Sequence, residues 1–119
     1  MQPINSAQKQ LLFAPDSWVV ELDGGKMRTL RTFYQTIARQ LHFPDYFDPN
    51  LDALFDSLCS LDHAPDSTRK VAVVIRHPRL MLSRARTEER QSVLDVLKDA
   101  CIPENRYDEL SLSVYSFDE

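Results

Sequence analysis

Two aspartates, Asp52 and Asp56, carry the clearest chemical signal in this sequence. Asn50 can cap a helix that begins at the next residue, because its side-chain oxygen can accept a hydrogen bond from a free amide of the first turn. The two aspartates are four positions apart, so both carboxylates lie on one face of that helix. Asp52 is favourable at the positive end of the helix, but Asp56 adds a like charge that costs roughly a few tenths of a kcal/mol. Two stacked carboxylates of this kind are suited to binding a cationic partner.

The charge around this helix is one-sided over a longer stretch. Residues 40–68 contain no Lys or Arg. The acidic residues in this interval are Asp45, Asp48, Asp52, Asp56, Asp62 and Asp66. Charge alone favours a solvated acidic surface, because most charge runs have no other role. Tyr46 and Phe47, which precede the helix, favour the alternative of a binding face.

The same segment resembles the signature of the barstar family, small intracellular inhibitors of secreted bacterial ribonucleases. The family pattern reads Tyr-aromatic-Gly-x-Asn-Leu-Asp-Ala-Leu-Trp-Asp-x-Leu. The residues in matching places are Tyr46, Phe47, Asn50, Leu51, Asp52, Ala53, Leu54, Asp56 and Leu58. Residues 92–100 resemble, more loosely, the last helix of the family, which contributes another acidic contact at the position of Asp99. The resemblance covers the chain from about Trp18 onward.

This resemblance implies an intracellular protein that inhibits a ribonuclease. An active site that cleaves RNA gathers cationic side chains, so carboxylates in the phosphate positions can take the hydrogen bonds meant for the substrate. By analogy with the family, Asp56 enters the catalytic cleft as a phosphate mimic, Asp52 pairs with a flanking base, and Asp99 adds a contact from another helix. The other expected partner-binding residues are Tyr46, Asn50, Leu51 and Phe55. The expected partner is a basic ribonuclease or nuclease-like toxin, and the free protein is expected to be a monomer.

Four positions depart from the family pattern. Asp48 replaces the glycine, and Pro49 follows it. Phe55 replaces tryptophan, which keeps an aromatic ring but removes an N–H donor, and Leu61 stands where the known inhibitor has an aromatic residue. These changes leave the identity of the enzyme open. Two alternatives therefore remain: an immunity protein against a different toxin, and a barstar-fold protein-binding module without inhibitory activity.

Other chemistry has weaker support in the sequence. Asp52, Asp56 and His63 match no familiar spacing of metal ligands, so we expect no metal and no cofactor. No serine is accompanied by a base or an oxyanion motif, so we expect no catalytic residue and no enzyme activity. A basic stretch contains Arg76, Arg79, Arg84, Arg86 and Arg90. With a net charge of −4, these arginines are better explained as compensation for the acidic face than as a nucleic-acid site.

Length and composition indicate one domain in a chain of 119 residues, large enough to bury a single core. Its two cysteines, Cys59 and Cys101, lack the spacing of a paired motif, so reduced thiols in a cytoplasmic protein are expected. The start of the chain has neither a basic region nor an apolar core typical of a signal peptide, and no apolar stretch could span a bilayer. We therefore expect no contact with a membrane.

The elements that position these residues form an alternating pattern. Apolar runs predict strands at residues 18–22, 71–75 and 110–115, and the glycines after the first strand mark a tight turn. Helices are predicted at residues 30–41, at residues 51–61 and from residue 87 to about residue 100. The unbroken apolar run at 71–75 is typical of a central strand. This order predicts an α/β two-layer sandwich in which a three-stranded parallel sheet, in the order 1-2-3, has helices packed on one face.

We expect the chain to divide into a barstar-like domain at residues 17–119 and an N-terminal extension of unknown role at residues 1–16. The extension is polar except for Leu11, Leu12 and Phe13. These three side chains are candidates to cover part of the open face of the sheet.

Overall fold

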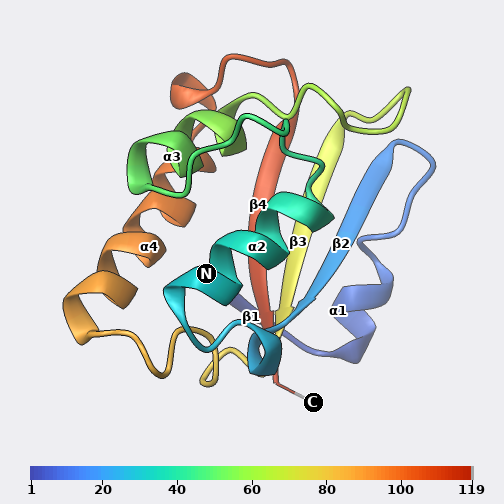
Figure 1. The fold of residues 1–119 in the computed structure, drawn as a ribbon. Coiled ribbons are helices and arrows are strands. Elements are labelled where there is room, and N and C mark those ends of the chain that lie inside the picture. The colour runs from blue at the N-terminus through green and yellow to red at the C-terminus, as the bar shows by residue number, and fades with distance from the viewer. Residues whose placement is uncertain (119) are drawn as a thin grey trace.

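The computed structural model describes residues 1–118 (Figure 1). The helices are α1 (Ser6–Gln10), α2 (Leu30–Gln40), α3 (Leu51–Cys59) and α4 (Thr87–Ala100). The strands are β1 (Gln2–Ile4), β2 (Ser17–Asp23), β3 (Lys70–Arg76) and β4 (Ser111–Phe117), and short 3-10 turns occupy Gly24–Lys26 and Pro103–Asn105. The predicted class, an α/β fold with a parallel sheet, is confirmed.

Within the described residues the sheet has four strands in the order β1-β4-β3-β2, all of them parallel. The prediction of a three-stranded sheet in the order 1-2-3 is therefore wrong. The three predicted strands keep their relative order, with β3 in the middle, but β1 adds a fourth strand beside β4. Only three residues form β1, and Pro3 cannot donate to a ladder, which is tolerated at an edge. A stretch this short has no periodicity by which the sequence could predict it.

α2, α3 and α4 cover one face of the sheet, whereas α1 lies on the other (Figure 1). Lys9 of α1 forms an ion pair with Glu21 and lies 4.7 Å from the centre of the Phe117 ring. Both partners alternate along their strands with the residues that face the large helices. The handedness of crossovers explains this placement. The chain crosses the sheet in one direction from β2 to β4 and in the opposite direction from β1 to β2, so a right-handed connection must use the opposite face.

The expectation that helices pack on one face is thus correct for the three long helices and wrong for α1. The three apolar residues of the N-terminal segment also differ from expectation. Leu11 is 83% exposed and Phe13 is 56% exposed, so neither covers the open face, and Leu12 is only half-buried. The side chain of Lys9 covers part of the open face of the sheet instead, with its aliphatic stem on the sheet and its ammonium group beside Glu21.

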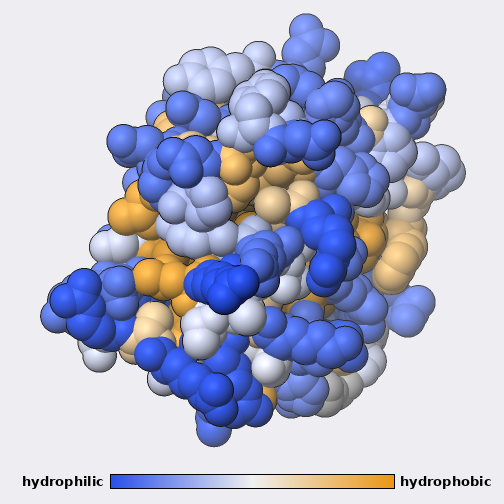
Figure 2. Space-filling model, viewed as in Figure 1, coloured by the Kyte–Doolittle hydropathy of each residue, from blue (hydrophilic) through white to orange (hydrophobic). Residues whose placement is uncertain are grey.

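The hydrophobic core lies between the sheet and the three long helices. Its buried members include Leu22, Val73, Val114, Phe33, Ile37, Leu54, Leu58, Val93 and Leu97. Each large side chain contributes about 1.5–3 kcal/mol when it is fully buried. On the outer side of these helices the surface is mainly hydrophilic, with apolar side chains visible between the polar ones (Figure 2). Among residues 1–118, no helix has the length and apolar character needed to cross a membrane.

Candidate functional site

α3 is built so that its apolar residues face the core and its aspartates face outward. Asn50 caps the helix as predicted, because its Oδ1 accepts a hydrogen bond from Ala53 N at 2.8 Å. Leu54 and Leu58 are completely buried. Asp52 and Asp56 lie on the exposed side of the helix. Packing of the buried leucines against the core therefore fixes the orientation of α3, so that both carboxylates point outward.

No ion pair within residues 1–118 neutralises these carboxylates. In the described part of the chain, the ion pairs are Lys9–Glu21, Arg86–Glu89 and Arg106–Asp108. None of them involves Asp52, Asp56 or Asp99, and all three of these aspartates are exposed. Their negative charge is consequently available to an external cation.

α3 and α4 pack against each other (Figure 1), and residues of both helices line a groove of about 630 Å³. Its lining residues are Leu51, Asp52, Phe55, Asp56, Val96 and Asp99. Phe55 and Val96 are half-buried and give the groove an apolar component, while three carboxylates come from the two helices. The structure therefore brings together five of the seven residues predicted to bind a partner.

The remaining two predicted residues lie beside this groove. Tyr46 is 87% exposed and shares a neighbouring hollow with Asp56. Asn50 shares a different hollow with Asp52. Since the side-chain oxygen of Asn50 already accepts from Ala53 N, its clearest role in the free protein is to cap the helix.

The loop before α3 is held by aromatic packing. The ring of Phe47 lies 5.1 Å from that of Phe43 and 6.1 Å from that of Tyr34. In the described chain the non-glycine residues with positive φ are His42, Ser67, His77 and Leu82. Asp48, at the position of the family glycine, is not among them. The loop therefore forms without a backbone conformation that needs glycine at this position.

Sequence reasoning missed Tyr107, which is 73% exposed and lines the hollow shared by Tyr46 and Asp56. Tyr107 follows the short turn after α4, and its amide donates to the carbonyl of Cys59 at the end of α3. Leu61 lines the same hollow but is only 4% exposed. The exposed aromatic ring in this part of the hollow thus belongs to Tyr107 and not to residue 61. No local pattern in the sequence indicates that Tyr107 contacts the end of α3.

The hollow beside Asn50 and Asp52 also contains Glu88 and Glu89 from the start of α4. Hydrogen bonds from the backbone and side chain of Arg86 hold the pKa of Glu89 below its usual range. Tyr34 lines this hollow, and its pKa is raised first by burial and then by the charge of Glu89. The acidic surface therefore continues from α3 onto the first turn of α4.

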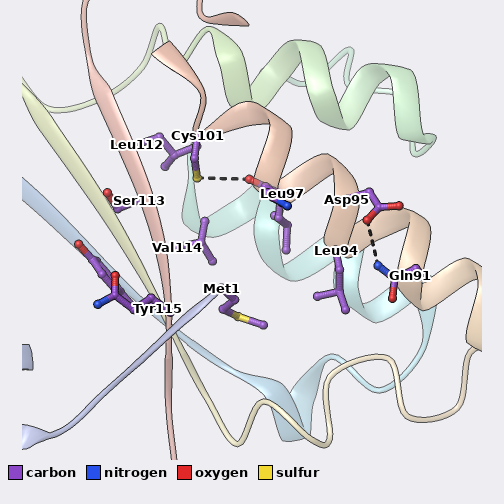
Figure 3. Close-up of a pocket in the computed structure, with 12 residues that line it drawn as sticks. Met1, Gln91, Leu94, Asp95, Leu97, Cys101, Leu112, Ser113, Val114 and Tyr115 are labelled. Carbon is purple, nitrogen blue, oxygen red and sulfur yellow. Dashed lines mark hydrogen bonds between the residues drawn. The ribbon is translucent and has the colours of Figure 1, made fainter. Parts of the chain in front are cut away.

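Another hollow, of about 650 Å³, lies between α4 and β4 near the start of the chain (Figure 3). Leu94, Leu97, Leu112 and Val114 form the apolar part of its lining, and Cys101 donates through Sγ to the Leu97 carbonyl at 3.2 Å. Burial raises the pKa of the Cys101 thiol, so this thiol is a poor nucleophile at neutral pH. None of the predicted binding residues lines this hollow.

A metal site is not formed from the acidic residues described so far. In the described part of the chain, no three His, Cys, Asp or Glu side chains come close enough together to hold a metal ion. His63 lies in the hollow with Asp56, whereas Asp52 lines the groove and the hollow of Asn50. The arrangement is therefore one of separate carboxylates on a surface.

The chain was compared with models of known protein families. The family model for barstar, described as the barnase inhibitor, matches residues 18–114. This range begins in β2, ends in β4 and contains all seven residues of the predicted binding surface. β1 and α1 lie outside it.

Proposed function

Because this chain belongs to the barstar family, we propose that it inhibits a ribonuclease by placing the groove between α3 and α4 over the active site of the enzyme. One observation carries this proposal: three exposed aspartates from two helices surround a single groove, and none has an ion-pair partner among residues 1–118. Such a surface is complementary to a cluster of positive charge.

The mechanism follows from the electrostatics of RNA cleavage. A ribonuclease concentrates Arg, Lys and His side chains around the scissile phosphate, and these groups repel one another while the site is empty. Asp56 supplies two carboxylate oxygens in place of phosphate oxygens and accepts charge-assisted hydrogen bonds. Asp52, one helical turn earlier, pairs with a flanking base, and Asp99 adds a third negative charge from α4. Substrate cannot enter while these groups occupy the site.

Aromatic and aliphatic side chains provide the apolar part of the contact. Phe55 and Val96 line the groove together with the carboxylates, and Leu51, which also lines it, is 38% exposed. Tyr46 is an exposed flat ring beside Asp56 and can bury a large area against the rim of the cleft. Desolvation of the carboxylates is costly, so each must be paired on binding. The surface of this protein and the cleft of the enzyme must therefore be complementary in both shape and charge.

A closely related candidate is an immunity protein against a different toxin. Tyr107 favours it, because this exposed ring lies in the same hollow as Asp56 while Leu61 is buried. The aromatic ring next to Asp56 then comes from a different position than in the family pattern, which allows a partner other than the usual secreted ribonuclease. Both candidates use the same acidic groove and differ only in the enzyme that is bound.

The experiment that tests the proposal is a binding and inhibition assay. Purified barnase, and any ribonuclease or toxin encoded beside the gene for this chain, would be titrated with the native protein and with Asp56→Asn. Asp66→Asn is the matched control, because Asp66 is an exposed aspartate in the loop before β3, outside the groove. We expect the native protein and the control to inhibit one of these enzymes, and Asp56→Asn to weaken inhibition by about tenfold or more.

Two outcomes would contradict the proposal. If no tested enzyme is bound or inhibited by the native protein, the inhibitor function is wrong. If Asp56→Asn inhibits as well as Asp66→Asn does, the acidic groove is not the contact surface, even though the protein is an inhibitor.

A further inference from the structure

The C-terminal ends of α3 and α4 meet at a single buried guanidinium. The side chain of Arg106 is 2% exposed. Its Nη1 donates to the carbonyl of Leu58 in the last turn of α3 at 3.0 Å, and to the carbonyl of Ala100 at the end of α4 at 2.9 Å. Both oxygens belong to helix ends that lack intrahelical donors. One nitrogen therefore joins the two helices that form the groove.

Asp108 holds this guanidinium in place. Arg106 donates from Nε to Asp108 Oδ1 at 2.9 Å and from Nη2 to Oδ2 at 2.7 Å, which is the two-point geometry that fixes a guanidinium plane. The same carboxylate accepts from the Leu61 amide at 3.0 Å, and Arg106 Nε also donates to the Leu110 carbonyl at 2.9 Å. We call this set of contacts the Arg106 clamp. It connects the end of α3 to the start of β4.

Neighbouring residues reinforce the clamp. The Tyr107 amide donates to the Cys59 carbonyl at 3.0 Å, and Asn105 Nδ2 donates to the Asp99 carbonyl at 3.0 Å. α3 has no basic residue in its last turn. The cation that a helix C-terminus favours therefore comes to α3 from Arg106, far along the chain.

The clamp lies close to the carboxylates of the groove. Asp56 precedes Leu58 by two residues, and Asp99 immediately precedes Ala100. A helix rises about 1.5 Å per residue, so the bridged carbonyls are about 3 Å along α3 from Asp56 and about 1.5 Å along α4 from Asp99. A change in the angle between the helices at this point would move one aspartate relative to the other.

We propose that Arg106 is a positioning residue for the partner surface, because it sets the distance between the α3 carboxylates and Asp99. This inference rests on the proposed function in so far as that surface binds a ribonuclease. Lysine cannot replace arginine here, since its single ammonium group cannot hold two carbonyls and a two-point carboxylate in one plane. The geometry of the free protein alone is enough to test the structural part.

The first experiment needs no partner. Residual dipolar couplings of the α3 and α4 amides would be measured in native protein, Arg106→Lys and Arg90→Lys. Arg90 is the matched control, because it also donates to two main-chain carbonyls, those of Met81 and Pro78, but at the start of α4, away from the C-terminal ends of α3 and α4. We expect the angle between α3 and α4 to change only in Arg106→Lys. If that variant does not fold, Asp108→Asn removes the two-point contact and keeps Arg106. An unchanged angle in the folded variant would overturn the inference.

The second experiment measures binding of the ribonuclease that the inhibition assay identifies. In the native background we expect Asp99→Asn to weaken binding about tenfold, and in the Arg106→Lys background by less than about threefold. Asp52→Asn should weaken binding equally in both backgrounds. An equal loss for Asp99→Asn in both backgrounds would show that Arg106 is only structural. If no ribonuclease binds the native protein, the proposed function fails, and the angle between the helices still decides the role of Arg106.

Discussion

Asp56 of α3 and Asp99 of α4 line the same groove, although β3 lies between their helices in the sequence. If both carboxylates contact one cluster of cations on the partner, their contributions to binding must depend on each other. We predict that Asp56→Asn and Asp99→Asn show a coupling energy of about 1 kcal/mol in a double-mutant cycle of partner affinity. Asparagine keeps the shape of each side chain and removes only its charge.

The control for this cycle combines Asp56→Asn with Asp95→Asn. Asp95 is on α4 as well, but it accepts a hydrogen bond from Gln91 and lines the hollow near β4, away from the groove. We expect this pair to be additive within about 0.5 kcal/mol. Equal coupling in both cycles would mean that Asp56 and Asp99 do not face a common cluster.

The acidic groove also predicts a dependence on salt. The association rate with a basic ribonuclease should fall steeply as sodium chloride is added, because salt screens attraction between exposed charges over about 10 Å at 0.1 M. Stopped-flow measurements at several salt concentrations would give the slope. Asp52→Asn should make this slope shallower while leaving the dissociation rate less affected. An association rate independent of salt would contradict electrostatic steering.

Local patterns in the sequence were sufficient to predict the elements that carry the groove. Asn50 caps α3 as expected, and Leu54 and Leu58, four positions apart, lie on its buried side. The apolar run at residues 71–75 is buried in an interior strand of the sheet, as expected. These features depend on the types and spacing of residues that are close together in the chain. Such local patterns are present in a single sequence.

Contacts between distant segments were not predictable in the same way. β1 exists because it pairs with β4 at the other end of the chain, and its three residues show no pattern of their own. Arg106 and Tyr107 belong to a loop by composition, and only the fold shows that they contact the end of α3. The sequence therefore predicts which faces are buried, but not which loop stabilises each helix end.

The turn after β2 has a strict steric requirement. A Cβ atom at Gly24 would lie 2.8 Å from the Arg76 carbonyl oxygen and still closer to that of His77. These backbone oxygens can move away only if the end of β3 is displaced. Gly24→Ala should therefore lower the free energy of unfolding by about 3 kcal/mol. Gly25→Ala is the control, because its Cβ would meet only side-chain atoms, Asp23 Oδ1 at 3.2 Å and Leu80 Cδ1 at 3.6 Å. Urea denaturation of both variants measures the difference, and equal midpoints would disprove this reading of the turn.

Glu89 gives a prediction about pH. Its hydrogen bonds with Arg86 hold the pKa of the carboxyl below its usual range, so folding favours the ionised form. The resulting stability is present above the pKa of an unfolded Glu, about 4.3, and is lost as the pH falls through the lower folded value. The native protein and Glu89→Gln should therefore differ less in thermal midpoint as the pH is lowered from 5 to the lowest pH at which both stay folded.

NMR titration of the side-chain carboxyl of Glu89 would measure the pKa directly. Glu88→Gln is the control for stability, because it removes a neighbouring charge without touching the contact between Glu89 and Arg86. A carboxyl of Glu89 that titrates at its ordinary value would contradict the prediction.

The N-terminal segment should stabilise the domain without being essential for its fold. Deletion of residues 1–10 removes β1 and α1, together with the contacts of Lys9 to Glu21 and Phe117. It keeps Asp16, whose carbonyl accepts from Arg69 and Lys70 at the start of β3. We expect the free energy of unfolding to fall by about 2 kcal/mol, because part of the open face of the sheet becomes exposed. Lys9→Met should account for only a fraction of this loss, since an ion pair near the surface contributes little. Unchanged stability after the deletion, measured by urea denaturation, would mean that β1 adds nothing to the sheet.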